Sequence, residues 1–322
     1  MIKINETSLE TAVLLIVFNR PTETEQVFDA IRQAKPKKLY IAIDAPRINN
    51  DQDVKLTNAV KKIVYNIDWE CEVKTLEQDT NLGCRYGPVT AIDWFFDNET
   101  HGIILEDDCV PALSFFSFCQ TLLKHYASNQ QVMSITGTNV SSASKEPPDY
   151  FYSNYALMWG WATWADRWEK YDRNLTTWPE YRRSNLLRNV NAGNVYFKKT
   201  WETILDRTSN DEFDAWDYQW IYTCWLHRGL TIVPNKNLIT NIGFNDQATH
   251  TKKSNEYVER LPRHEVAQAL TPPFEIRANL EIDQSINNVF FRINLLSYIK
   301  AKIYEIKLLW FCLVALKKYL RK

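Results

Sequence analysis

Three consecutive carboxylates are the residues of this chain with the clearest chemical potential. Glu106, Asp107 and Asp108 directly follow the apolar run 103–105, which reads as the end of a buried strand. Adjacent carboxylates repel one another, and each costs several kcal/mol to remove from water without a partner. Oxygen ligands at a strand end suit a hard divalent cation such as Mg²⁺ or Mn²⁺, which would neutralise phosphate oxygens. The alternative is that these acids cap the helix predicted after them.

The chain before residue 140 alternates between strand and helix patterns. Short apolar runs rich in β-branched residues indicate strands covered on both faces, and helical spacing follows them, with a capping-box pair at Thr22 and Glu25. The predicted strands are 12–18, 38–44, 71–78, 102–105 and 131–137, and the predicted helices are 20–35, 56–64, 87–97 and 112–127. This order predicts right-handed βαβ units and an α/β fold with a mostly parallel sheet flanked by helices.

Polar residues follow each of the first four predicted strands. They are Asn19 with Arg20, Asp44, Asn81 with Gly83, and the acids 106–108. Ligands of open α/β sheets bind beyond the carboxyl ends of the strands, so we expect these side chains to meet at one edge. The sequence contains neither GxxxxGKS/T nor GxGxxG, two glycine-rich patterns that bind phosphates. The charge of a bound diphosphate would therefore be met by a metal ion and by Arg or Lys.

The composition indicates a globular protein without a nucleic-acid partner. The 322 residues fit one large domain or two closely packed ones, and 45% apolar residues suffice for a sizeable core. The net charge of −1 gives no sign of nucleic-acid binding. The six cysteines form no CxxC pair, which argues against zinc and for free thiols in a reducing compartment. The polar start of the chain carries no signal peptide, so we expect a cytoplasmic protein, with homo-oligomerisation left open.

Aromatic residues accumulate past residue 140, where the alternation ends. Gly160 stands between Trp159 and Trp161. The glycine permits close backbone approach, and the indole rings could either stack on a sugar or pack in the core. The segment 210–229 reads as an acidic loop followed by a helix. Asp217 has tryptophan neighbours there, so partial removal from water could raise its basicity, and a solvated helix start is the alternative.

Together these pieces resemble the nucleotide-sugar glycosyltransferases of the GT-A fold, in particular the N-acetylglucosaminyltransferase I type and bacterial surface-polysaccharide transferases. The matching segments run in order over roughly residues 10–252: VFNRP (17–21), IDAPR (43–47), NLGCRYG (81–87), the acids 106–108, WDYQW (216–220) and NIGFNDQATHT (241–251). The common family motif is Asp-x-Asp, whereas this chain has Glu at position 106. The ordered set of segments is more specific than the acid triplet alone.

The resemblance implies a role for each matching residue. Asp108 and His250 would bind the metal ion, Mn²⁺ or Mg²⁺, and Asp217 would deprotonate the acceptor hydroxyl, with Asp214 as the substitute. Asp44 would recognise the base, which favours a UDP-sugar because a carboxylate can accept the N3–H of uracil. The other nucleotide-sugar contacts would come from Phe18, Asn19, Arg20, Asn81, Gly83, Arg85, Glu106 and Asp107, and the acceptor contacts from Trp159, Gly160 and Trp161.

The implied function is metal-dependent, inverting transfer of a hexose or N-acetylhexosamine to a glycan or lipid-linked glycan in bacterial surface polysaccharide or lipopolysaccharide synthesis. Residues 1–140 would bind the nucleotide sugar, 141–255 would complete the same domain, and 256–322 would form a helical C-terminal extension. Two alternatives stay open, namely a sugar-phosphate nucleotidyltransferase and a non-catalytic glycan-binding protein. A nucleotidyltransferase usually carries a Gly-rich, basic loop after its first strand, where this chain has NRPTET.

The end of the chain is strongly basic. Residues 289–322 carry a charge of +7, which leaves −8 for residues 1–288. The longest uninterrupted apolar run there, 308–316, has nine residues, whereas a spanning helix needs about 20. We therefore expect a basic amphipathic helix that lies on the inner face of the cytoplasmic membrane. The alternative is a helical hairpin packed on the catalytic domain or on a second subunit.

Overall fold

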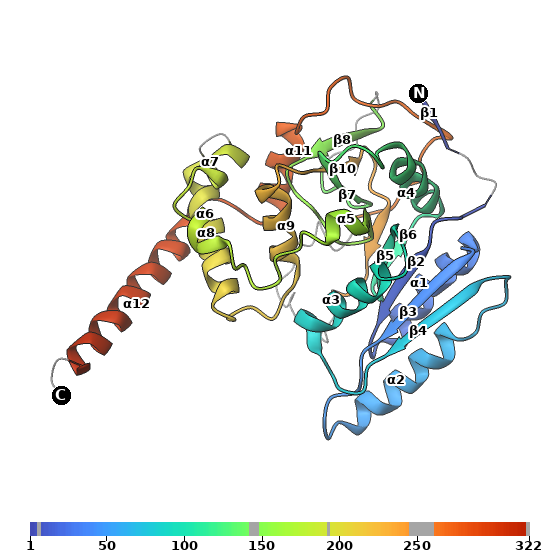
Figure 1. The fold of residues 1–322 in the computed structure, drawn as a ribbon, viewed down its shortest axis with the longest axis horizontal. Helices are drawn as coiled ribbons and strands as arrows, with labels where there is room; N and C mark the ends of the chain where they lie inside the picture. The colour runs from blue at the N-terminus through green and yellow to red at the C-terminus, as the bar shows by residue number, and fades with distance from the viewer. Residues whose placement is uncertain (5–7, 142–147, 192–193, 245–260, 320–322) are drawn as a thin grey trace.

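The computed structural model describes residues 1–4, 8–141, 148–191, 194–244 and 261–319. Within these residues, a central sheet of eight strands has the order β4-β3-β2-β5-β9-β7-β10-β8 and carries helices on both faces (Figure 1). Its strands are β2 (Val13–Val17), β3 (Lys38–Ile43), β4 (Glu72–Glu77), β5 (His101–Glu106), β7 (Val132–Thr136), β8 (Tyr150–Ser153), β9 (Trp161–Trp164) and β10 (Leu230–Pro234). The fold is α/β with a mixed, mostly parallel sheet, which confirms the predicted class.

Four helices of the first half cover the two faces of the sheet. They are α1 (Pro21–Ala34), α2 (Asp51–Val64), α3 (Gly83–Phe96) and α4 (Leu113–His125). α3 begins at Gly83, four residues before its predicted start, and includes Pro88. Alternate residues of β2 point to opposite faces. Val13 and Leu15 therefore pack with α1, α2 and α4, while Leu14 packs with α3.

The carboxyl ends of β2, β3 and β5 lie at one edge of the sheet. β2 pairs in parallel with both neighbours, so that Val17 lies opposite Ile43 on one side and Ile16 lies opposite Glu106 on the other. This register brings the polar residues that follow the three strands next to one another. It produces the convergence that the sequence predicts for a ligand site of an open α/β sheet.

Strands from the second half complete the same sheet. β9 lies antiparallel between β5 and β7, and β10 runs parallel to β7 with β8 antiparallel at the edge. The aromatic-rich segment 154–172 does not reveal β9 as a strand, because all four of its residues are buried and show no alternation. Residues 1–140 and the described part of 141–255 therefore contribute to one sheet rather than to separate ones.

A layer of tryptophans fills the space between the sheet and the second-half helices. These helices are α5 (Ala165–Trp168), α6 (Trp178–Tyr181), α7 (Leu186–Val190), α8 (Val195–Ser209) and α9 (Asp217–Leu226). The Trp161 ring is fully buried, with its centroid 5.8 Å from those of both Trp216 and Trp220. Gly160 has a φ of +60°, and a Cβ there would lie 2.4 Å from Cδ1 of Ile239. Trp161 therefore packs in the core, and its predicted contact with an acceptor stays a prediction.

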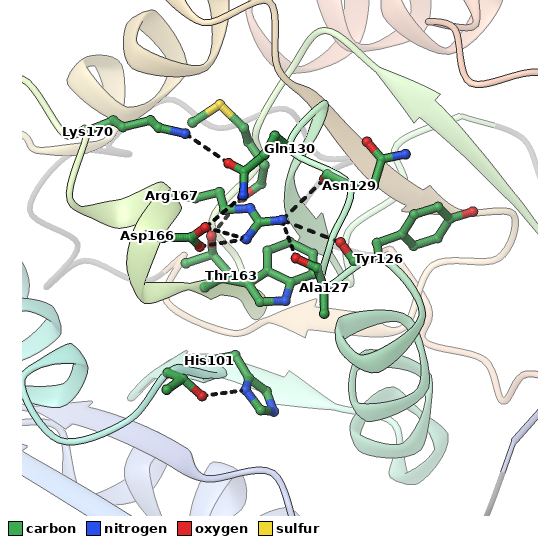
Figure 2. Close-up of polar contacts among 12 residues, drawn as sticks. His101, Tyr126, Ala127, Asn129, Gln130, Thr163, Asp166, Arg167 and Lys170 are labelled. Carbon is green, nitrogen blue, oxygen red and sulfur yellow. Dashed lines mark hydrogen bonds and ion pairs between the residues drawn. The ribbon is translucent and has the colours of Figure 1, made fainter.

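Arg167 joins α5 to the end of α4 (Figure 2). Its guanidinium donates hydrogen bonds to the carbonyl oxygens of Ala127 at 2.8 Å and Asn129 at 3.2 Å, and it pairs with Asp166 at 2.6 Å. The carbonyls at a helix end lack partners within the helix, and this buried arginine supplies donors there. Arg167 follows closely after Trp164 of β9, which lies opposite His101 at the amino end of β5. The contacts of Arg167 therefore stabilise this end of the sheet, whereas the acids follow the other end of β5.

The C-terminal part packs on this body and then leaves it. β12 (Ala269–Leu270) pairs with β1 (Ile2–Lys3), and α11 (Leu280–Ser285) continues into the π-helical turn η1 (Ile286–Phe290). Buried Asp283 accepts hydrogen bonds from Ser153 Oγ at 2.6 Å and Asn154 Nδ2 at 2.8 Å. The last helix, α12 (Leu295–Tyr319), begins against α8 and extends away from the sheet (Figure 1). In the described part of the chain, no helix combines the length and apolarity needed to cross a bilayer.

Candidate active site

A cavity of about 560 Å³ opens at the carboxyl edge of the sheet. This volume lies within the range of roughly 300–1,000 Å³ that is typical of small-molecule sites. Nine of the residues predicted from the sequence line it: Phe18, Asn19, Arg20, Asp44, Asn81, Gly83, Glu106, Asp107 and Asp214. They come from the ends of β2, β3 and β5, from the start of α3 and from the loop before α9. The cavity is therefore built where the alternating pattern places a ligand.

Glu106 and Asp107 line this cavity, and Asp107 and Asp108 face a single arginine. Arg20 Nη1 lies 2.8 Å from Asp108 Oδ2 and 3.3 Å from Asp107 Oδ1. Burial is the main cause that raises the pKa of both Glu106 and Asp107 above the usual range, with the charge of Asp108 adding to it and Arg20 opposing it. The raised pKa values mean that three ionised carboxylates beside one guanidinium are unfavourable without further positive charge, which a bound cation would supply. Oxygen donors with excess negative charge fit a hard divalent cation.

Asp108 also contacts a strand from the far end of the sequence. β6 (Cys109–Pro111) pairs antiparallel with β11 (Ile239–Asn241), and the Asn241 amide Nδ2 donates to Asp108 Oδ1 at 3.4 Å. The backbone N–H of Ile242 donates to the carbonyl oxygen of Asp108 at 2.8 Å. A Cβ on Gly243 would lie only 2.1 Å from Asp108 Oδ2, so this glycine leaves room for the carboxylate. The start of the segment 241–251 is thus placed at the predicted metal ligand.

His250 lies outside the described residues, so its predicted metal contact stays a prediction. Among the described residues, no three His, Cys, Asp or Glu side chains form a group arranged to bind a metal ion. A cation at Asp108 would therefore need further oxygen or nitrogen ligands from a bound diphosphate or from beyond the described segments. Mg²⁺ binds in this way in many proteins, through one or two carboxylates together with substrate phosphates.

Asp44 connects the end of β3 to the start of α3. Its carboxylate accepts hydrogen bonds from the backbone N–H groups of Ala45 at 2.9 Å, Leu82 at 2.9 Å and Gly83 at 3.0 Å. It accepts a fourth hydrogen bond from the side-chain amide of Asn81 at 3.1 Å. Burial raises its pKa, and these backbone donors oppose that shift. Four donors use the acceptor positions of one carboxylate. Recognition of uracil by Asp44 stays a prediction, and it would require one of these donors to be exchanged.

Asp53 is a site residue that the sequence reasoning missed. It is 1% exposed, lines the cavity, and receives a forked contact from Arg47, with Nε to Oδ2 at 2.5 Å and Nη2 to Oδ1 at 2.8 Å. The Asn19 amide donates to the same carboxylate at 2.8 Å. Arg47 in turn lies 5.7 Å from the centre of the Phe18 ring. The sequence contains one sign of this arrangement, an asparagine that can cap a helix. The Asn50 side chain accepts a hydrogen bond from the backbone N–H of Asp53, and α2 therefore begins at Asp51, five residues before its predicted start.

Replacing Asp53 with asparagine should lower the free energy of unfolding at neutral pH by about 1–3 kcal/mol, because the charged hydrogen bonds from Arg47 weaken. The Arg47 contact is the largest cause that lowers the pKa of Asp53, to about 2. A depressed carboxyl pKa contributes stability above the unfolded-state value of about 3.9, and the contribution is lost as the pH falls towards the folded value. Denaturant unfolding between pH 7 and 2 should show the two proteins converging below about pH 4.

Asp29→Asn is the matched control for this stability series, because Asp29 pairs with Arg32 on the exposed face of α1. An exposed pair contributes little, so this variant should stay close to wild type at every pH. A difference between Asp53→Asn and wild type that stayed constant down to pH 2 would contradict the linkage.

The start of α9 brings two further predicted acids towards the cavity. Asp214 lines the cavity, and a Cβ on Gly83 would lie 3.8 Å from its Oδ2. Asp217 is the first residue of α9 and half-buried, and its charge contributes to the raised pKa of Glu106. Asp217 is not part of the cavity wall, whereas Asp214 is. The structure therefore places Asp217 within electrostatic reach of Glu106, and Asp214 on the cavity wall near Gly83.

Arg85 and Trp159 are not part of the cavity wall. Arg85 is buried on α3 and its Nη1 lies 2.5 Å from Asp211, so it ties α3 to the loop that carries Asp214. Trp159 is half-buried, with its ring centroid 5.5 Å from that of Phe244. Among the predicted acceptor residues, only Trp159 keeps an exposed part of its side chain. The predicted ligand contacts of Arg85 and Trp159 stay predictions.

Comparison with known proteins yields similarity of fold only. No protein-family model matches the chain, and no curated protein matches it in sequence. Among solved structures, a UDP-glucose pyrophosphorylase complexed with UDP-glucose has a TM-score of 0.32 at 9% identity, over 50% of this chain and 78% of that one. The inositol-1-phosphate CTP transferase from T. maritima gives 0.30 at 9%, over 51% and 75%. An apo UDP-glucose pyrophosphorylase gives 0.34 at 9%, over 70% and 90%. These values describe a distant likeness in the arrangement of strands and helices, and they carry no argument about activity.

Proposed function

We propose that this protein is a metal-dependent, inverting glycosyltransferase that uses a nucleoside diphosphate sugar, with UDP-sugars as the first donors to test. The observation that carries the proposal is the cavity at the carboxyl edge of the sheet, with Glu106, Asp107 and Arg20 on its wall. Asp108 lies behind this wall, 2.8 Å from Arg20 Nη1. A nucleotide would occupy the part lined by Phe18 and Asp53, and its diphosphate would point to the acids. The acceptor would be a glycan or a lipid-linked glycan.

The proposed reaction breaks the bond between C1 of the sugar and the diphosphate oxygen. The bonding electrons leave with the nucleoside diphosphate, the acceptor oxygen bonds to C1 from the opposite face, and Asp217 takes the acceptor proton. A divalent cation bound by Asp108 would supply positive charge to the leaving diphosphate. Arg20, already beside Asp108 at 2.8 Å, would donate hydrogen bonds to the same oxygens. Asp214 is the substitute for the base.

A sugar-phosphate nucleotidyltransferase is the second candidate, because the sequence pattern of a parallel sheet with acids at a strand end also fits that class. Such an enzyme must bind the triphosphate of its nucleotide, commonly in a long Gly-rich loop after the first strand. In this chain three residues, 18–20, separate β2 from α1, and none of them is glycine. This short connection favours a donor with two phosphates over a nucleoside triphosphate.

The product of the reaction distinguishes the candidates. The protein is incubated with nucleotide sugars and Mn²⁺, and separately with nucleoside triphosphates and sugar phosphates, and the released species is assayed. The proposal expects nucleoside diphosphate from the first set. Pyrophosphate from the second set would establish the nucleotidyltransferase and contradict the proposal. Glycan binding without release of either species would instead favour a non-catalytic glycan-binding protein.

Replacing Gly243 with alanine should lower sugar transfer about 100-fold, since a displacement near 1 Å in a catalytic constellation can have that effect. The added Cβ would meet Asp108 Oδ2 at 2.1 Å and push the carboxylate aside. Gly229→Ala is the matched control, because its Cβ would displace the Met133 side chain at 2.4 Å instead. Initial rates at saturating donor should fall for Gly243→Ala alone. Equal rates in the two variants would contradict the placement of Asp108 in the reaction.

A further inference from the structure

One face of α12 packs on the body of the protein. Ala301 is 4% exposed, and Ser297 Oγ lies 3.0 Å from Thr200 Oγ1 of α8. Glu305 pairs with Lys199 of α8. At about 100° per residue, residues 297, 301 and 305 share one side of the helix. The first three turns of α12 are therefore fixed to α8 in a defined rotational orientation.

The opposite face of α12 presents apolar side chains to solvent. Five of them, between 43% and 64% exposed, are Leu295, Leu296, Ile299, Ile303 and Ile306. On a helical wheel they form a continuous stripe about 100° wide, centred opposite the face that contacts α8. Soluble surfaces expose single apolar residues freely, whereas a contiguous apolar stripe marks a contact surface. We call these five residues the apolar stripe of α12.

Lysines border the apolar stripe on both sides. Lys300 and Lys307 lie along one border and Lys302 along the other, and all three are exposed. The one carboxylate of α12, Glu305, is half-buried and pairs with Lys199 and, at 3.4 Å, with Lys302, so the described exposed residues of α12 include no acid. The sequence beyond the described side chains continues with four basic residues and no acid at 317–322. An apolar stripe between lysines is complementary to a surface with negative charge outside and hydrocarbon beneath.

We propose that the apolar stripe of α12 docks on an anionic lipid surface, with the helix axis in the plane of the interface. The stripe enters the boundary between headgroups and acyl chains while the bordering lysines contact lipid phosphates. A second copy of this chain is a poorer occupant, because pairing two stripes brings lysines together without opposing acids. α12 also projects clear of the sheet, so a flat surface can reach it (Figure 1). The inference is independent of the proposed activity.

Vesicle flotation of the full chain tests this docking. Wild type is compared on vesicles of phosphatidylcholine alone and of phosphatidylcholine mixed with phosphatidylglycerol. Binding should occur on the anionic vesicles and decline as salt is raised. The triple variant Ile299→Gln, Ile303→Gln, Ile306→Gln should bind at least about tenfold more weakly, since its apolar area is lost. The triple variant Lys300→Gln, Lys302→Gln, Lys307→Gln should lose about fivefold per lysine.

Matched controls separate docking from general charge and solubility. Lys55→Gln, Lys62→Gln, Lys124→Gln removes the same charge from exposed positions on α2 and α4, and Phe274→Gln removes an apolar ring that is fully exposed elsewhere. Both controls should bind like wild type. Failure of wild type to float, equal flotation of wild type and both α12 variants, or equal binding to neutral vesicles would overturn the proposal. A wild-type dimer that the isoleucine variant converts to a monomer, without vesicle binding, would identify a second copy as the occupant.

Discussion

Replacing Asp108 with asparagine should lower sugar transfer about 100- to 1,000-fold, the range found when one preorganised electrostatic contact to a transition state is removed. Asparagine has nearly the same size, so the neighbouring contacts with Arg20 and Asn241 can adapt. The amide carries no negative charge, and we expect weaker binding of Mn²⁺ and of the donor. Initial rates over a series of Mn²⁺ concentrations measure both effects, and thermal unfolding checks that the fold persists.

Asp206→Asn is the matched control for Asp108→Asn. Asp206 on α8 also pairs with an arginine: Arg182 Nε lies 2.7 Å from its Oδ1 and Arg182 Nη2 lies 2.9 Å from its Oδ2. Neither residue lines the cavity. Loss of this ion pair should leave transfer unchanged. If Asp108→Asn kept most of its activity in Mn²⁺, or if both variants lost activity equally, Asp108 would have no specific part in the reaction.

Replacing Asp217 with asparagine should lower turnover about 100- to 10,000-fold while donor affinity stays near that of wild type. A general base acts on the acceptor proton in the transition state, so its loss affects turnover rather than the binding of donor. Asp217 starts α9, next to buried Trp216 and close enough to Glu106 to affect its pKa. Steady-state kinetics with donor and acceptor varied separately measure the two quantities.

Asp214→Asn is the informative companion, because Asp214 lines the cavity while Asp217 does not. Full activity of Asp217→Asn together with a collapse of turnover in Asp214→Asn would transfer the base role to Asp214. A change confined to donor affinity in Asp217→Asn would remove that residue from the chemistry. The ion pair between Arg85 and Asp211, at 2.5 Å, holds the loop that carries Asp214 and leads into α9, so Asp211→Asn tests the placement of this loop.

The fold of the first half could be predicted because each strand is a local apolar run and each helix has its own periodicity. Parallel pairing then places the strand ends together, which is why Arg20, Asp44 and Glu106 were found from spacing alone. β9 could not be found in this way. Its four residues are buried on both faces between β5 and β7, so nothing in their own pattern distinguishes a strand from a packed loop.

Contacts between distant segments account for what the sequence did not reveal. Asp53 receives a hydrogen bond from the amide of Asn19, which lies 34 residues earlier in the chain, and this contact forms only in the assembled fold. Gly243 matters only because β11 pairs with β6 and brings it against Asp108. The burial of Trp161 follows from α9 packing on β9, which the aromatic composition of the segment cannot show. Local patterns define elements, whereas these facts require the assembled sheet.

The most direct test of the central claim is the melting temperature of the protein with UDP, GDP, dTDP and UDP-sugars, each with and without Mn²⁺. A ligand at about 100 times its dissociation constant adds about 2.7 kcal/mol of stability, which corresponds to a rise of about 4 °C for a chain of this size. We predict such a rise for at least one nucleoside diphosphate or its sugar, only with Mn²⁺, and its loss in Asp108→Asn. No metal-dependent rise with any of these ligands, or an equal rise in Asp108→Asn, would contradict the account.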